Sequence, residues 1–261
     1  MANTLEDKIL ELGAENVAAF FAEPVSGASL GAEPAAPGYF KRIREICDQY
    51  GVLFIADEVM CGMGRTGYLF AMEAEDACPD IITIAKGLGA GYQPIASVMA
   101  NEKIINAIIE GSGTLWNGHT YMSHAVACAG ALAVLKVIEE DQLLDSVHVQ
   151  GKKLENMLRA EFENHPNIGD IRGRGLFWGL EIVKDKITKE PFPFELNLAG
   201  KIKSDILENG MLSYPSQGCV DGISGDHILL APPYAVSDDE LEFIVSTTKK
   251  CLQNQLDKVI S

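Results

Sequence analysis

Short apolar runs alternate with stretches of helical spacing along the first half of the chain. The runs at residues 17–22, 52–56, 81–85 and 95–99 are almost continuously hydrophobic, which is typical of strands covered on both faces of a sheet. Residues 4–12 and 39–50 instead have helical periodicity, and Gly51 ends the second of these helices. This alternation predicts an α/β fold whose sheet is at least partly parallel.

The pattern of the second half is different. Two helical stretches cover residues 123–160 almost without interruption and join near residues 140–141. The later half of residues 171–183 suits a strand, and a helix near 195–209, a strand at 227–231 and a closing helix at 237–253 follow. We therefore expect a domain change near residue 150, with a first domain of residues 1–150 and a second of residues 151–261.

Composition and charge narrow the class of partner. The chain has 261 residues, of which 47% are hydrophobic and 22% charged, as in an ordinary globular protein of one large or two modest domains. Its net charge of −16 disfavours nucleic acid and anionic membrane surfaces as partners. Neither class of partner is therefore expected.

The cysteine spacing and the N-terminal residues indicate which metal sites, disulfides and cellular location to expect. The six cysteines form neither a CxxC pair nor a Cys/His cluster, so no metal site and no disulfide framework is predicted, and most are expected to be buried. The first residues lack the basic and apolar regions of a signal peptide, and no apolar run reaches membrane-spanning length. The expected location is cytoplasmic.

Two charged residues follow two of the predicted strands. Asp57 comes after the run at 52–56, and Lys86 comes after the run at 81–85. Ligands of open α/β sheets bind outside the carboxyl ends of the strands, so these side chains share one crevice if the strands are near neighbours. Taken separately, an Asp there is more often a turn or helix cap, and a Lys a solvated surface group.

Several motifs flank these two residues in a fixed order. The chain contains Ala-Asp-Glu-Val at 56–59, Gly-Met-Gly-Arg-Thr-Gly at 62–67, Cys-Pro-Asp-Ile-Ile-Thr at 78–83, Ala-Lys-Gly-Leu-Gly at 85–89, Gly-His-Thr-Tyr at 118–121, Arg-Gly-Arg-Gly at 172–175 and Leu-Ala-Pro-Pro at 230–233. On these motifs it resembles the class III pyridoxal-phosphate-dependent aminotransferases, in particular the ω-amino acid:pyruvate transaminases, over essentially its whole length. The resemblance implies a pyridoxal-phosphate-dependent transferase of fold type I, similar to aspartate aminotransferase. Residues 1–150 would be the C-terminal half of the cofactor-binding large domain, and residues 151–261 a C-terminal α+β small domain.

The resemblance also implies roles for four residues. Lys86 would form a Schiff base with pyridoxal 5'-phosphate and then act as the general base, in a partly desolvated cleft that favours an uncharged amine. Asp57 would pair with the pyridine nitrogen and keep it protonated. Val59 would pack on one face of the ring, although an ordinary core valine is the alternative. Thr120 would reach the cofactor phosphate of the neighbouring subunit of a homodimer with shared active sites, although a helix N-cap is the alternative.

Two departures from the family pattern concern the substrate. Met60 stands where ornithine-type members usually have Gln. Leu229 stands where they have the Arg that binds the substrate carboxylate, and the sequence has no Arg after Arg174. A bidentate guanidinium is hard to replace. We therefore expect an ω-amino acid or an amine as donor and a 2-oxo acid such as pyruvate as acceptor.

The family's motifs begin here at Glu23-Pro24-Val25, whereas a long N-terminal portion precedes them in other members. Part of the phosphate site and the aromatic residue that stacks on the ring are therefore expected to be missing. The alternatives to an active aminotransferase are a noncatalytic truncated fragment and one half of a split enzyme. A related pyridoxal-phosphate decarboxylase or aminomutase shares the Asp/Lys pair and stays open as well.

Overall fold

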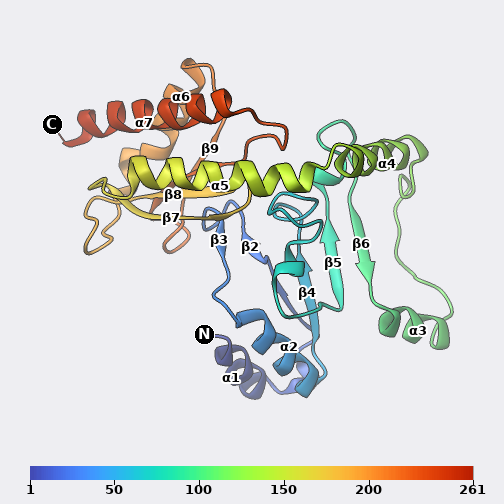
Figure 1. Cartoon of the computed structure of the whole chain (residues 1–261). Helices are drawn as coiled ribbons and strands as arrows, with labels where there is room; N and C mark the ends of the chain where they lie inside the picture. The colour runs from blue at the N-terminus through green and yellow to red at the C-terminus, as the bar shows by residue number, and fades with distance from the viewer. Residues whose placement is uncertain (261) are drawn as a thin grey trace. The chain divides into compact units, whose positions relative to one another are not determined.

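A computed structural model describes residues 1–260 (Figure 1). Contacts divide the chain into two compact units: unit 1 contains residues 1–24, 35–64 and 68–142, and unit 2 contains residues 25–34, 65–67 and the chain from 143 onward. The expected change near residue 150 falls inside helix α5 (Leu143–Phe162). Because a continuous helix moves as one body, the transition lies before α5, and two short early segments belong to the later unit.

Unit 1 is built around a four-stranded sheet in the order β1-β4-β5-β6. The first three strands are parallel and β6 runs antiparallel to β5, which confirms the predicted α/β sheet. The strands are β1 (Ala19–Ala22), β4 (Leu53–Asp57), β5 (Ile81–Ile84) and β6 (Ser97–Ala100), and the helices are α1 (Asn3–Leu12), α2 (Tyr39–Tyr50), α3 (Glu102–Glu110) and α4 (Ala125–Glu140), with short 3-10 turns η1 (Ala14–Asn16), η2 (Ala71–Ala74) and η3 (Lys86–Leu88).

Apolar faces of α1 and α2 pack with β4 in the core of unit 1. Phe40 and Phe54 are fully buried, and their rings stack with centroids 5.6 Å apart. Gly51 ends α2 with a left-handed φ of 69°, as its position in the sequence predicted. The expectation of burial on both faces is wrong for the two outer strands, since Phe21 on β1 is 55% exposed and Val98 on β6 is 68% exposed. Within the described residues, little of the chain covers these two side chains.

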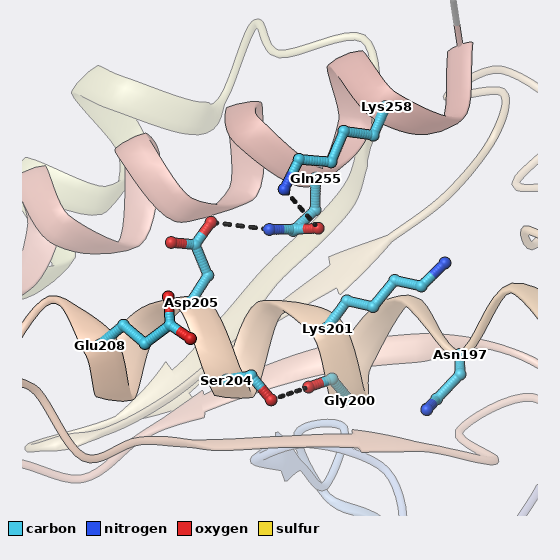
Figure 2. A pocket seen from close by; sticks show the side chains of 8 residues that line it. All are labelled: Asn197, Gly200, Lys201, Ser204, Asp205, Glu208, Gln255 and Lys258. Atoms are coloured by element: carbon cyan, nitrogen blue, oxygen red, sulfur yellow. Dashed lines mark hydrogen bonds between the residues drawn. The ribbon is translucent and has the colours of Figure 1, made fainter.

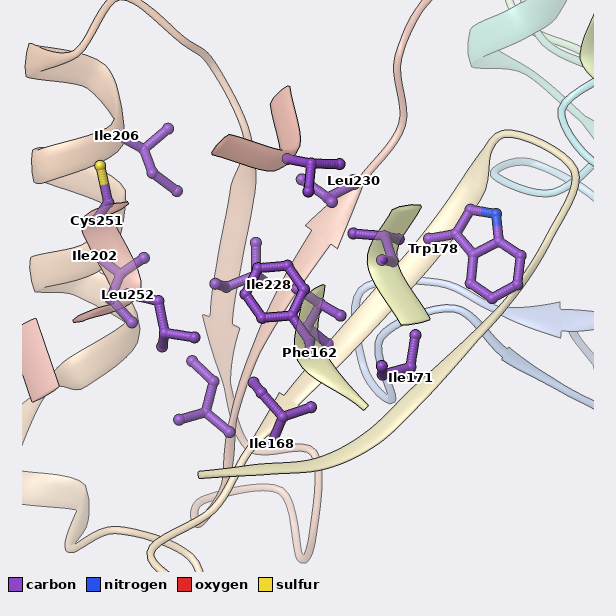
Figure 3. Close-up of a cluster of buried hydrophobic side chains, with 14 of the residues drawn as sticks. Phe162, Ile168, Ile171, Trp178, Ile202, Ile206, Ile228, Leu230, Cys251 and Leu252 are labelled. Carbon is purple, nitrogen blue, oxygen red and sulfur yellow. The ribbon is translucent and has the colours of Figure 1, made fainter. Parts of the chain in front are cut away.

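Unit 2 is an antiparallel sheet in the order β7-β8-β10-β9 with helices α5, α6 and α7. Buried side chains from the sheet and the helices, among them Phe162, Ile202 and Ile228, form its core (Figure 3). The elements are β7 (Ile168–Arg174), β8 (Phe177–Ile182), β9 (Tyr214–Gln217), β10 (Asp226–Leu230), α6 (Leu198–Glu208), α7 (Asp238–Ile260), the 3-10 turn η4 (Phe194–Leu196) and a separate hairpin of β2 (Val25–Ser26) and β3 (Glu33–Pro34).

Arg172 on β7 attaches the early segment 25–34 to this sheet. Its side chain is only 9% exposed, and its Nε lies 3.0 Å from Glu33 Oε2 and donates to Gly31 O at 3.1 Å. The guanidinium also bonds Glu181, Asp170 and Leu30 O. Burial lowers the pKa of Arg172, but the hydrogen bond to Glu181 and its charge outweigh burial, so the pKa is raised. The side chain therefore stays charged inside the unit.

His227 on β10 is fully buried, and neither of its ring nitrogens has a hydrogen-bond partner within residues 1–260. Burial, together with the charge of Arg172, lowers its pKa to about 4 from an ordinary value of 6.5. The unfolded chain thus takes up a proton at a higher pH than the folded chain does. We expect the free energy of unfolding to fall by up to about 3 kcal/mol as the pH drops through this window.

Urea unfolding on either side of that window measures this loss. His227→Leu removes the titrating group, so its free energy of unfolding should depend less on pH than that of the parent chain. The difference between the two profiles of unfolding free energy against pH removes the contribution of neighbouring carboxyls. One of these is Asp226, whose pKa is raised by burial. Identical pH profiles for the two proteins would contradict the assignment to His227.

Candidate active site

The carboxyl ends of β4 and β5 bring Asp57 and Lys86 to the same edge of the unit 1 sheet. Asp57 is the last residue of β4, and its Cα partner on β5 is Thr83. Lys86 begins the 3-10 turn η3 directly after β5. Since the two strands are parallel neighbours, the condition that the sequence left open for a shared crevice is met.

The Asp57 carboxylate is held through one oxygen. Its Oδ1 accepts a hydrogen bond from the backbone N–H of Val59 at 2.9 Å and one from Thr83 Oγ1 at 3.4 Å. Both bonds found for this carboxylate within residues 1–260 go to Oδ1, so Oδ2 can accept a further donor. Asp57 and Val59 are half-buried. A half-buried carboxylate with one restrained and one available oxygen fits the protonated nitrogen of a pyridine ring.

Lys86 has an unusual backbone. Its φ is +38°, in the left-handed region that non-glycine residues rarely adopt, and such strain clusters at functional sites. The turn after it depends on Gly89, because a Cβ there would lie 2.2 Å from Gln93 O. The Lys86 side chain is exposed. The expectation of a desolvated cleft is thus not met by the described chain alone, because nothing in it covers the amine.

Sequence reasoning missed Glu58, which anchors the loop after Asp57. Glu58 is fully buried, and its carboxylate accepts hydrogen bonds from the N–H groups of Ala71 at 2.6 Å and Met72 at 2.9 Å. Burial raises its pKa, although these two bonds act in the opposite direction. A charged residue directly after a candidate catalytic carboxylate was the available signal. Glu58 holds the segment 59–72 in place behind the candidate site.

Thr120 lies outside this pair of strand ends. It belongs to the exposed segment 111–124, which joins α3 to α4 (Figure 1). The alternative reading of Thr120 as a helix N-cap is wrong, because the N-cap of α4 is His124, whose Nδ1 accepts a hydrogen bond from Ala127 N at 3.3 Å. Thr120 is therefore free of a local capping role and available to another molecule.

Leu229, which stands at the position of the ornithine-type arginine, has no group that could bind a carboxylate. Leu229 is 3% exposed and sits within β10. A shallow groove of about 360 Å³ in unit 2 contains none of the predicted site residues (Figure 2). Its walls are Asn197, Gly200, Lys201, Ser204, Asp205, Glu208, Gln255 and Lys258.

The described residues also bear on metal binding, disulfides and membrane spans. No group of three or more His, Cys, Asp or Glu side chains in residues 1–260 is arranged to hold a metal ion. Its cysteines are free thiols, with Cys78 and Cys128 exposed and the other four buried. Over the same residues, every helix is too short or too polar to cross a membrane.

Comparison with known proteins places these features in context. Residues 1–252 match the family Aminotransferase class-III. An uncharacterized aminotransferase of Schizosaccharomyces pombe is 47% identical over 97% of this chain and 55% of its own length. Gamma aminobutyrate transaminase 2 of Solanum lycopersicum is 40% identical over 97% of this chain and 54% of its own length.

A solved structure gives the same picture. The thermostable (S)-enantioselective omega-transaminase from Thermomicrobium roseum superposes with a TM-score of 0.90 at 34% identity, covering 98% of this chain and 55% of that chain. The match confirms the predicted fold and, with the family assignment, the predicted cofactor class, pyridoxal phosphate. The chain spans about half the length of the curated relatives it matches.

Proposed function

Because the chain belongs to the class III aminotransferase family, we propose that it carries the lysine and the carboxylate of a pyridoxal-phosphate-dependent aminotransferase site. The reaction moves an amino group from an ω-amino acid or amine to a 2-oxo acid such as pyruvate. The observation that carries this proposal is the placement of Asp57 and Lys86 at the ends of two adjacent parallel strands, with Asp57 Oδ2 available.

Each residue has a separate task. When bound, pyridoxal phosphate supplies an electrophilic aldehyde and a pyridinium ring that accepts electrons. Lys86 would hold this group covalently through its amine. With that amine free, Lys86 Nζ would act as the base that removes a proton from the substrate carbon and as the acid that gives it back. Asp57 would keep the ring nitrogen protonated, and Val59, which is half-buried, would supply apolar contact to the ring.

The overall reaction balances without an external oxidant. The donor loses its amino group and leaves with a carbonyl group, and the 2-oxo acid receives the amino group. Leu229 supports this donor class, because a buried aliphatic side chain cannot bind an α-carboxylate as an arginine does. The carboxylate of the 2-oxo acid would then have to be bound by another group. The names of two relatives, a gamma aminobutyrate transaminase and an omega-transaminase, support the same class.

The proposal also includes a further polypeptide that covers exposed apolar side chains of unit 1. Tyr92, Val98, Trp116, Tyr121 and Leu132 of unit 1 are 82%, 68%, 87%, 78% and 67% exposed. So many exposed large apolar side chains mark a surface that other protein covers. We propose that a second copy of the chain covers part of it, with Thr120 serving the partner's cofactor, and that the remainder of the family's length covers the rest.

The second candidate function is favoured by the exposure of Lys86 itself. A catalytic lysine needs a cleft that limits its contact with water, and a covering segment would have to supply that cleft. The chain would then be one half of a split enzyme, or a noncatalytic fragment. A pyridoxal-phosphate decarboxylase or aminomutase would use the same two residues and stays a lesser alternative.

A donor panel separates these functions. The purified chain is mixed with pyridoxal phosphate and assayed with ω-amino acids, simple amines and α-amino acids as donors, against pyruvate and 2-oxoglutarate as acceptors. We expect ω-amino acids or amines with pyruvate to give the highest rates. Transfer only after co-expression with the part of the family's length that this chain does not span would identify a split enzyme. A protein that stays colourless and inactive in both arms would contradict the aminotransferase.

A further inference from the structure

Thr83 contacts both the side chain and the backbone next to the candidate ring-binding carboxylate. Its Oγ1 donates to Asp57 Oδ1 at 3.4 Å, and its carbonyl oxygen accepts the N–H of Glu58 at 2.9 Å. Both contacts follow from register, because Thr83 and Asp57 are Cα partners on parallel strands and their side chains leave the same face. The end of β4 is thereby fixed to β5.

The two bonds on Asp57 Oδ1 restrain the carboxylate in different ways. The Val59 N–H belongs to the turn that begins at Asp57, so this bond moves with the turn. The Thr83 hydroxyl belongs to β5, the strand whose end carries Lys86 only three residues later. Only the Thr83 bond therefore ties the carboxylate to the strand that presents the amine.

The remainder of the turn is already fixed by other groups. Glu58 is buried and holds the N–H groups of Ala71 and Met72. The Asp57 carboxylate is less restrained than the backbone of the turn, because rotation about its χ1 bond alone would move it out of the site. A catalytic pair works only when its members are held in a fixed mutual geometry.

We propose that Thr83 is a positioning residue, whose hydroxyl fixes the rotamer of Asp57. Oδ2 of Asp57 then keeps a constant position relative to Lys86, from which it can bind the pyridine nitrogen. This inference rests on the proposed function, since Asp57 must be the ring partner for its rotamer to matter. Thr83 itself touches neither the cofactor nor the substrate in this role.

The test uses a matched pair of variants in the full chain. Thr83→Val removes the hydroxyl but keeps the β-branched shape, the strand preference and the backbone carbonyl. Thr83→Ser keeps the hydroxyl and serves as the conservative rescue. Both variants should unfold at the urea midpoint of the parent chain, which shows that any other effect is not a loss of folding.

The first measurement needs no cofactor. Three-bond NMR couplings about χ1 of Asp57 should report one rotamer in the parent chain and in Thr83→Ser, and averaging over several rotamers in Thr83→Val. A single unchanged rotamer in Thr83→Val would overturn the proposal, whether or not the chain binds cofactor. This arm therefore judges Thr83 even if the aminotransferase function itself fails.

The second measurement is a titration with pyridoxal phosphate followed by visible absorbance. We expect Thr83→Val to weaken the affinity about fivefold, as for the loss of one modest hydrogen bond, and Thr83→Ser to bind as the parent does. Equal affinity in Thr83→Val and the parent would overturn the role of Thr83. No absorbance in the parent chain would instead count against the proposed function, and the coupling measurement would remain the judge of Thr83.

Discussion

Lys86→Ala is expected to abolish covalent attachment of pyridoxal phosphate and to lower the rate of transamination at least about 10³-fold. Loss of a general base alone costs about 10²- to 10⁴-fold, and this variant also loses the amine that condenses with the aldehyde. The visible absorbance of a lysine-bound cofactor should vanish with the activity. Absorbance titrations and single-turnover rates with an ω-amino acid measure the two effects.

Two control variants sharpen this result. Lys103→Ala removes an exposed lysine of α3 in the same unit, and it should keep the absorbance and activity of the parent chain. Lys86→Arg keeps a positive charge at the end of β5 but cannot condense with the aldehyde, so it should behave as Lys86→Ala does. If Lys86→Ala kept the visible absorbance, the assignment of this lysine would be wrong.

Arg172→Met is expected to lower the free energy of unfolding of unit 2 by about 3–5 kcal/mol, the usual cost of removing one partner from a buried ion pair. The substitution leaves Glu181 largely buried without its cation and deprives Gly31 O and Leu30 O of their donors. Urea unfolding followed by the fluorescence of Trp178, which is 4% exposed, reports this unit. Trp116→Phe removes the exposed tryptophan of unit 1 from the signal.

The controls for Arg172 separate burial from charge. Lys184→Met breaks the exposed ion pair with Glu190 in the same unit and should leave the unfolding midpoint unchanged. Adding Glu181→Leu to Arg172→Met removes the uncompensated carboxylate, so the double variant should be more stable than Arg172→Met alone. A single variant that unfolds with the parent chain would contradict the assigned role of Arg172 as the attachment of segment 25–34.

Much of the fold of unit 1 could be predicted from the sequence, because its strands are short apolar runs that end at charged residues or glycine. The strand at 168–174 was missed, since Arg172, Gly173 and Arg174 give it no apolar alternation. Its ladder partner is the neighbouring strand β8, and Arg172 bonds Glu181 on that strand. Arg172 also bonds groups at 30–33, which lie far away in the sequence, and a pattern read along the chain cannot show those contacts.

For the candidate site, too, features local in the sequence could be predicted and contacts between distant residues could not. Asp57 and Lys86 could be proposed because they stand at the ends of apolar strands within motifs that resemble those of a known family. The contribution of Thr83 instead depends on the parallel register between the two strands. The sequence marked Glu58 only by its charge next to Asp57, and its role was missed because the amides that it binds lie 13 and 14 residues further along the chain. The exposure of Lys86 could likewise not be predicted from the sequence, because it depends on which other segments of the folded protein pack over the side chain.

Borohydride reduction of the full chain with pyridoxal phosphate, followed by peptide mass mapping, tests the central claim most directly. Reduction converts a lysine–cofactor bond into a permanent one, so the mapped position identifies the lysine that formed it. The account predicts one pyridoxyl group per chain, located on Lys86 and absent from Lys86→Ala. Labelling spread over surface lysines such as Lys103, or no labelling of Lys86 at all, would contradict it.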